Sequence, residues 1–154
     1  MNGLVDRLRL VLPAAWLGLM VGVAGIATPA PFALLAQADA GRVVARILGQ
    51  EAWLAIALGL SVFILERRAA RRVAAAEAGS LFSTGMLLAL GTLFCTVAGY
   101  FAVQPMLAQA RAGQHALSFG QLHAVSLAFF ALKALLVATL AWRAAGGLRP
   151  AIAS

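Results

Sequence analysis

The sequence predicts an all-α integral membrane protein, a bundle of four transmembrane helices. Of its 154 residues, 63% are hydrophobic and 11% are charged, whereas soluble domains carry roughly 25% charged residues. The apolar residues form continuous runs, and about 20 such residues cross a hydrocarbon core of about 30 Å as a helix. These runs lack the alternation of apolar and polar residues that marks transmembrane strands.

The first predicted span is Leu10–Thr28, which follows a short polar start. Pro13 falls in its first turn, where the missing N–H leaves no helix bond unmade. Pro29 and Pro31 come directly after the span. Because proline lacks an N–H and its ring clashes with the preceding turn, we expect these two residues to end or kink the helix.

A short amphipathic helix is predicted at Asp39–Gly49, with apolar side chains on one side and Arg42 and Arg46 on the other. Such a pattern is typical of a helix that covers an apolar surface. We expect it to lie at the outer interface or to continue into the second span, Ala52–Leu65.

The third span is predicted at Leu81–Val103 and the fourth at Phe119–Trp142. Four spans place both termini and the connection Glu66–Ser80 on one side, which carries eight arginines against three on the other. The eight are Arg7, Arg9, Arg67, Arg68, Arg71, Arg72, Arg143 and Arg149, and the three are Arg42, Arg46 and Arg111. Because cytoplasmic loops carry the excess of Lys and Arg, we predict a bacterial inner-membrane protein with both termini in the cytoplasm.

The same distribution explains the net charge of +7. Basic residues at the ends of apolar runs indicate topology and contact with anionic lipid. We therefore expect membrane lipids as partners, together with a second copy of the chain or another membrane protein, and no nucleic acid.

An internal repeat links the two halves of the chain. The octet at 35–42, LAQADAGR, matches the octet at 107–114, LAQARAGQ, at an offset of 72. We predict a single membrane domain, 1–154, made of two similar hairpins at about 8–66 and 80–143. Both hairpins would insert the same way round, as in parallel repeats related by an axis along the membrane normal.

The fourth span carries an unusual polar face. At 100° per residue, His123, Ser126 and Lys133 lie on the same side of a helix. A charge at the centre of a bilayer costs about 3 kcal/mol or more, so it seldom persists without a partner or a use. One interpretation is an inward polar track, a proton relay or an anion site. The other is that His123 bonds a neighbouring helix and Lys133 bonds backbone carbonyls or extends to the interface.

A polar cluster is predicted on the outer side. Arg42 and Arg46 are four residues apart, and a like-charged pair at this spacing favours an anionic counterpart. Lipid phosphate, an internal carboxylate or a substrate are the alternatives. The cluster comprises Asp39, Arg42, Arg46, Glu51, Arg111, His115 and Gln121.

A site for copper or haem would depend on two histidines, His115 and His123, which are weak candidate ligands. Cys95 lies between Gly91 and Gly99, a row that close helix packing explains without a metal. No phosphate-binding loop, nucleophile elbow, paired-carboxylate site or zinc-binding helix is present. This favours a protein that is not an enzyme.

Several short motifs carry a family resemblance. They are Trp16-Leu17-Gly18, Pro31-Phe32, Ala40-Gly41-Arg42, Leu48, Arg111 and the stretch FGQLHAVS at 119–126. With them the chain resembles the small bacterial membrane proteins of domain-of-unknown-function family 4149, which are similar to eukaryotic transmembrane protein 205. The resemblance implies four membrane helices and no established activity. A remoter similarity of plan links it to membrane families that handle copper and haem, but their ligand motifs are missing.

Two functions follow as hypotheses. The first is a non-enzymatic membrane module, either a small-molecule or ion pathway or an accessory membrane subunit. It uses the polar face of the fourth span and the outer arginines, because intramembrane ionisable groups mark functional sites. The alternative is a haem- or copper-binding membrane protein for redox chemistry or metal handling.

Overall fold

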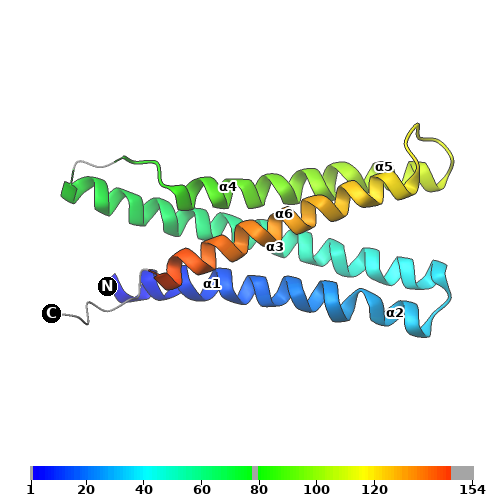
Figure 1. Ribbon diagram of the computed structural model, residues 1–154, viewed down its shortest axis with the longest axis horizontal. Helices are drawn as coiled ribbons and strands as arrows, with labels where there is room; N and C mark the ends of the chain where they lie inside the picture. The colour runs from blue at the N-terminus through cyan, green and yellow to red at the C-terminus, as the bar shows by residue number, and fades with distance from the viewer. Residues whose placement is uncertain (1, 78–79, 147–154) are drawn as a thin grey trace.

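The computed structural model describes residues 2–77 and 80–146, and nearly all of them are helical (Figure 1). No strand occurs among these residues. The helical segments, in chain order, are α1 (Asn2–Gly22), η1 (Val23–Ala27), α2 (Pro29–Leu34), α3 (Gln37–Glu77), α4 (Thr84–Thr96), η2 (Val97–Ala102), α5 (Val103–Arg111) and α6 (Phe119–Gly146). The segments η1 and η2 are π-helical turns that continue one helix into the next.

Four of the resulting helices are long and apolar enough to cross a membrane. They cover Gly3–Leu34, Gln37–Ala76, Thr84–Arg111 and Phe119–Gly146. Large apolar side chains such as Leu34, Leu87 and Leu135 are exposed on the outside of the bundle, where lipid rather than water is their natural surrounding. The predicted class, an all-α multi-pass membrane protein with four spans, is confirmed.

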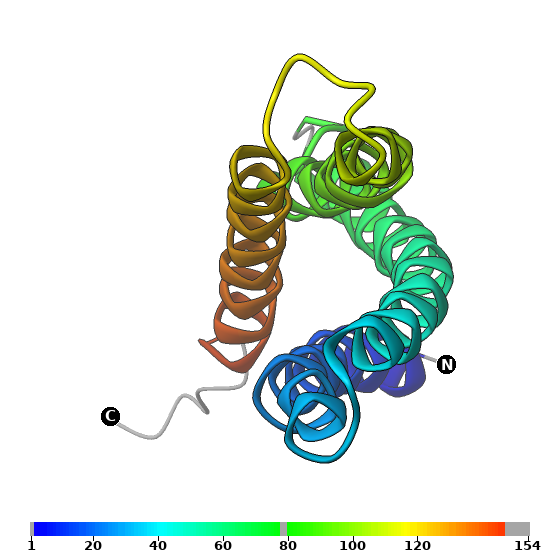
Figure 2. The same ribbon diagram turned by 90° about the vertical axis from the view of Figure 1, so that its right-hand side faces the viewer.

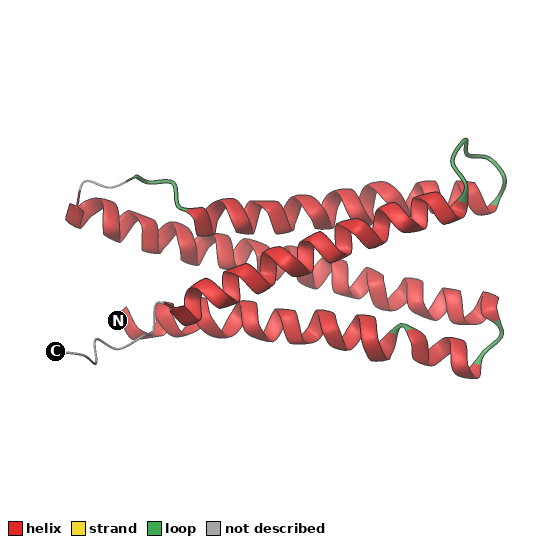
Figure 3. Cartoon of the chain, in the orientation of Figure 1, coloured by secondary structure: helices red, strands yellow, loops and turns green. Residues whose placement is uncertain are grey.

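The four helices surround a common interior. The helix α3 packs against α1 on one side and α4 on the other, and α6 packs against α4 and α1. Viewed along the bundle, α6 therefore stands opposite α3 (Figure 2). The α2–α3 turn and the α5–α6 loop lie at one end, here named the distal end. The start of α1 and the end of α6 lie at the other, the terminal end (Figure 3).

The separate interfacial helix predicted at Asp39–Gly49 is not confirmed. This segment forms the first turns of α3, which runs unbroken for 41 residues, or about 61 Å at 1.5 Å per residue. Gly49 does not interrupt it, because a glycine inside a helix costs only about 1 kcal/mol. Gly49 also packs closely: a Cβ added there would lie 2.6 Å from the hydroxyl oxygen of Tyr100.

Of the two alternatives predicted for Pro29 and Pro31, that they end the helix or kink it, the first is not observed, since α2 begins at Pro29 and continues to Leu34. The π-helical turn η1 precedes it, with the Thr28 N–H donating to the Val23 carbonyl at 2.8 Å. Proline and π-helical turns are recognised causes of helix bending. The third membrane helix has the same arrangement, since η2 precedes Pro105 and the helix continues to Arg111. The division into two similar hairpins stays a prediction.

Close packing in the core depends on glycines that face neighbouring helices. Trp16, Met20, Ala55 and Val137 form a central cluster from α1, α3 and α6. Beside it, a Cβ added at Gly99 would lie 2.5 Å from the Cβ of Phe129. The contact is with the base of a side chain, which cannot rotate away, so only glycine lets α6 approach at this point.

Gly99→Ala should therefore destabilise the bundle. Overpacking of a well-filled interior costs about 1–3 kcal/mol, and unfolding by sodium dodecyl sulfate would measure the loss. Gly120→Ala is the matched control, because nothing lies within 4 Å of a Cβ added there. Equal stability of Gly99→Ala and wild type would contradict this account of the η2–α6 contact.

Candidate functional site

A buried ion pair joins Glu51 on α3 to Lys133 on α6. The lysine Nζ lies 2.8 Å from each carboxylate oxygen, and the two side chains are 5% and 4% exposed, respectively. Phe130 covers the ammonium group, with its ring centroid 5.1 Å from Nζ. Because α3 and α6 stand opposite each other, the pair bridges the diagonal of the bundle.

The pair is buried in the bundle near the distal end of the apolar part of α3. Along α3, Glu51 is about 22 Å from Glu66 and about 7 Å from Arg46 at 1.5 Å per residue. It is therefore closer to the distal end than to the terminal end, but still inside the apolar stretch.

A small pocket of about 30 Å³ surrounds this pair. A buried water needs about 10–15 Å³ of such volume, so the pocket has room for two or three at most. Ser126 borders it and donates its hydroxyl to the Gly99 carbonyl at 3.1 Å, in the π-helical turn η2. The lining residues are Leu48, Glu51, Cys95, Thr96, Gly99, Tyr100, Ser126, Phe130 and Lys133.

A larger cleft, here named the distal cleft, opens at the distal end between α2, α3, α5 and α6. Its volume is about 890 Å³, within the range of about 300–1,000 Å³ that small-molecule sites usually have. Its lining residues are Thr28, Phe32, Gln37, Ala38, Gly41, Arg42, Val44, Ala45, Leu48, Gln104, Leu107, Arg111, Phe119 and His123. Leu48 borders both this cleft and the pocket around the ion pair.

The distal cleft is positively charged. Arg42 and Arg111 line it, and none of its lining residues is acidic. The guanidinium carbon of Arg111 lies 4.6 Å from the centroid of the Phe119 ring. Phe119 in turn stacks on His123, with ring centroids 5.8 Å apart and planes inclined by 11°. Asp39 pairs with Arg42, and both side chains are largely exposed.

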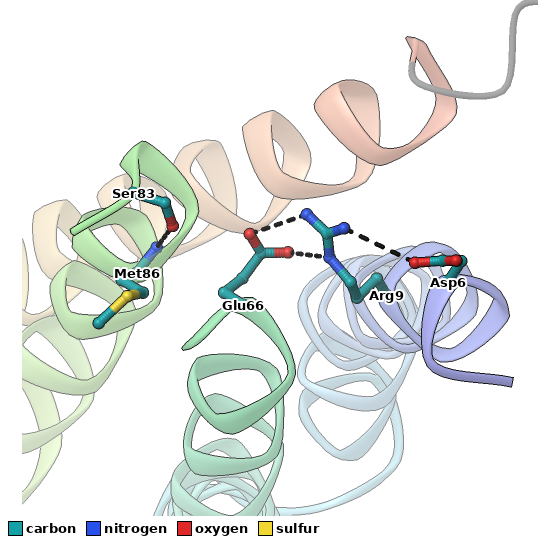
Figure 4. Close-up of polar contacts among 5 residues, drawn as sticks. All are labelled: Asp6, Arg9, Glu66, Ser83 and Met86. Carbon is teal, nitrogen blue, oxygen red and sulfur yellow. Dashed lines mark hydrogen bonds and ion pairs between the residues drawn. The ribbon is translucent and has the colours of Figure 1, made fainter. Parts of the chain in front are cut away.

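A second ion pair links Arg9 on α1 to Glu66 on α3 near the terminal end (Figure 4). The guanidinium donates to the two carboxylate oxygens at 2.7 and 3.1 Å, while Asp6 lies 3.9 Å away on the other side. A Cβ added at Gly85 on α4 would collide with the Glu66 carboxylate. In the sequence, Arg9 and the connection that begins at Glu66 bear only on the predicted membrane orientation. The contact between Arg9 and Glu66 is not predicted.

The structure divides the predicted polar face of the fourth span between two places. Lys133 and Ser126 line the small pocket, whereas His123 is exposed and lines the distal cleft. Leu48 borders both spaces.

The predicted outer cluster is also divided. Glu51 pairs with Lys133, a partner that the sequence does not predict. Arg46 is exposed on α3 and is not part of the cleft lining. Gln121 accepts hydrogen bonds from the backbone N–H and the hydroxyl of Ser118 at the start of α6. His115 accepts a hydrogen bond at Nδ1 from the Leu117 N–H. The other members, Asp39, Arg42 and Arg111, lie at or beside the distal cleft.

A metal site receives no support from the geometry. In residues 2–77 and 80–146, no three His, Cys, Asp or Glu side chains lie close enough together to hold a metal ion. The Nδ1 atom of His115 is engaged by Leu117. Binding of haem or copper by His115 or His123 stays a prediction.

The fold and its buried charges define a four-span integral membrane protein. Residues 11–116, more than half of the chain, match the family described as Domain of unknown function (DUF4149), and the chain belongs to this family. No curated protein and no solved structure matches it. Similarity to eukaryotic transmembrane protein 205 therefore stays a prediction. The family match ends at residue 116, so it does not include α6 and Lys133.

Removing one charge of the buried pair should destabilise the protein more than removing both. Lys133→Met leaves a buried carboxylate without a partner, which costs about 3–5 kcal/mol. Glu51→Gln combined with Lys133→Met removes both charges and should recover most of this loss. Unfolding by sodium dodecyl sulfate, followed by tryptophan fluorescence, measures both.

Arg143→Met serves as the control, because Arg143 is an exposed cation on the same helix and its loss should change stability by about 0.5 kcal/mol or less. If the losses from Glu51→Gln and Lys133→Met simply added in the double variant, the two side chains would not interact.

Proposed function

We propose that this protein is a non-enzymatic module of the bacterial inner membrane that provides a gated pathway for a small molecule or ion. Both termini lie in the cytoplasm, so the distal cleft faces outward. The observation that carries the proposal is that Leu48 borders both the distal cleft and the pocket around the Glu51–Lys133 pair. A ligand in the cleft is thus one side chain away from a buried pair of opposite charges.

The arginine distribution supports this orientation. Seven arginines of the described residues belong to the terminal side: Arg7, Arg9, Arg67, Arg68, Arg71, Arg72 and Arg143. Three belong to the distal side, namely Arg42, Arg46 and Arg111. Arg149, the eighth on the terminal side, lies outside the described residues. The excess of basic residues is cytoplasmic in membrane proteins.

The ion pair is suited to act as a gate. It bridges α3 and α6 across the interior, and the apolar cluster of Trp16, Met20, Ala55 and Val137 packs between α1, α3 and α6. Passage beyond the pocket therefore requires α6 to move relative to α3. Gly99 and Tyr100 of the π-helical turn η2 also border the pocket, and π-helical turns are frequent at functional sites.

The test uses full-length protein in sealed liposomes and measures the entry of water, protons, chloride, phosphate, acetate, glycerol and the anionic amphiphile decyl phosphate. We expect the wild type to accelerate entry of at least one of them over protein-free liposomes. Leu48→Trp should reduce that rate about tenfold, because it places a larger side chain at the one position that, among the described residues, borders both the cleft and the pocket. Each added barrier of about 1.4 kcal/mol slows a rate tenfold.

Leu60→Trp is the matched control, since Leu60 is 48% exposed on the outer face of the same helix. Rates equal to those of protein-free liposomes for every solute would contradict a pathway. Equal rates for Leu48→Trp and wild type would contradict the route past Leu48.

A further inference from the structure

We infer that the distal cleft binds an anionic amphiphile, a molecule that joins a phosphate or carboxylate group to an apolar chain. The inference deepens the proposed function by naming the class of ligand. It depends on that function only for the role of the cleft as an entrance, because binding is measurable without transport.

The charged part of the cleft selects an anion. Arg111 lies with its guanidinium over the Phe119 ring, and this contact leaves the N–H edges of the group available. Such planar edges bind carboxylate and phosphate oxygens in pairs. No acidic side chain among the described lining residues competes for Arg111.

Arg42 is able to contribute a second set of donors. Its carboxylate partner Asp39 does not line the cleft, and the side chains of Arg42 and Asp39 are 79% and 50% exposed. Exposed ion pairs of this kind contribute little to stability, because water screens both charges. Arg42 can therefore exchange part of its contact with Asp39 for a ligand in the cleft.

Much of the rest of the lining is apolar and favours an apolar chain, although Thr28, Gln37, Gln104 and His123 also border the cleft. Val44 and Leu107 are buried side chains of this lining, and Leu48 lies partly buried beside them. Along α3, Leu48 is about 9 Å from Arg42 at 1.5 Å per residue. A ligand that satisfies both parts must carry its charge at one end and an apolar chain at the other.

The size of the cleft favours a ligand larger than a bare inorganic ion. Small-molecule sites bury most of the surface of their ligand in about 300–1,000 Å³, and the cleft has about 890 Å³. Phosphate alone would leave the apolar lining in contact with water. A neutral amphiphile would cover that lining but leave the guanidinium groups without an anion.

The same chemistry can reach the cleft from two sources, a lipid of the bilayer or an amphiphile dissolved in water. The first experiment tests the shared chemistry with full-length protein in neutral maltoside micelles. Calorimetric titration with decyl phosphate should show saturable binding, while decanol and inorganic phosphate should bind at least about tenfold more weakly, because each satisfies only one part of the cleft.

The arginines are tested with two double variants. Arg42→Gln with Arg111→Gln should weaken binding of decyl phosphate about tenfold or more, since hydrogen bonds to charged groups are the stronger ones. Arg68→Gln with Arg71→Gln removes the same charge from exposed positions on α3 at the terminal side and should leave binding unchanged. Circular dichroism checks that both variants are folded.

Three results would overturn the inference. They are equal binding of decyl phosphate to the two double variants, binding of inorganic phosphate as tight as that of decyl phosphate, and binding of decanol as tight as that of decyl phosphate. The first removes the arginines from the site, the second makes it a simple anion site, and the third makes it an apolar one.

The second experiment separates the sources, and either outcome supports the shared chemistry. Native mass spectrometry of protein from nanodiscs of phosphatidylcholine and phosphatidylglycerol would show retained phosphatidylglycerol on the wild type, but not on the Arg42 and Arg111 variant, if the ligand is a lipid. Binding of decyl phosphate without retained lipid identifies a dissolved amphiphile.

The two proposals fail separately. Binding without solute entry in the liposome test would support this inference and contradict the pathway. Solute entry without binding of decyl phosphate would support the pathway and contradict this inference.

Discussion

The contact between Glu51 and Lys133 is the interaction on which the rest of the structure depends. It joins α3 and α6, the two helices that stand opposite each other, through two 2.8 Å hydrogen bonds in the bundle interior. Burial of such a pair seldom adds stability over well-packed apolar side chains, because desolvation offsets the attraction. Each charge left alone in the interior would nevertheless cost about 3–5 kcal/mol, so Glu51 and Lys133 require each other and thereby fix α3 relative to α6. The charges therefore call for an explanation in specificity or function, and intramembrane ionisable groups commonly mark a function.

The helix α3 connects this contact to the rest of the bundle. Glu51 and Glu66 are 15 residues apart, which at 100° per residue returns to within about 60° of the same face. Glu51 reaches α6 and Glu66 reaches Arg9 on α1, with Gly85 of α4 packed against the Glu66 carboxylate. One face of α3 thus fixes its position relative to its three neighbours. Its apolar side chains between the two glutamates, such as Ala55 and Val62, complete the buried core.

The sequence was sufficient for the fold class but not for the partner of Lys133. Lengths of apolar runs identify four spans, since that length is set by the bilayer. The stagger of α3 against α6 is set by side-chain packing across the bundle, and helical periodicity within one segment carries no information about it. Glu51 directly precedes the predicted span Ala52–Leu65 and was therefore grouped with the outer residues. In the structure, α3 starts 14 residues before Glu51, at Gln37. The scarcity of carboxylates was the available clue, because the chain has only five and a buried lysine needs one of them. The pattern around Pro29 and Pro31 could not decide between the end of a helix and a kink, because the π-helical turn η1 that precedes Pro29 has no marker in the sequence.

The charges of the distal cleft and of the buried pair suggest how a ligand and the gate would be coupled. Separating Glu51 from Lys133 without replacement costs about 3–5 kcal/mol, a factor of roughly 10²–10³ or more in population at 1.4 kcal/mol per tenfold. In the proposed pathway, an anion that reached Lys133 would replace the charge that the ammonium group loses, and the released Glu51 carboxylate would then need water or a proton in its place. A cation would have to displace Lys133 from Glu51, after passing a cleft whose charged lining residues are Arg42 and Arg111. The guanidinium groups at the mouth of the proposed route therefore favour anions at the first step. The neutral Glu51–Lys133 pair behind Leu48 adds no preference by sign, since an anion would leave Glu51 unpaired and a cation would leave Lys133 unpaired, and for an amphiphile it is the charged end that would meet Lys133.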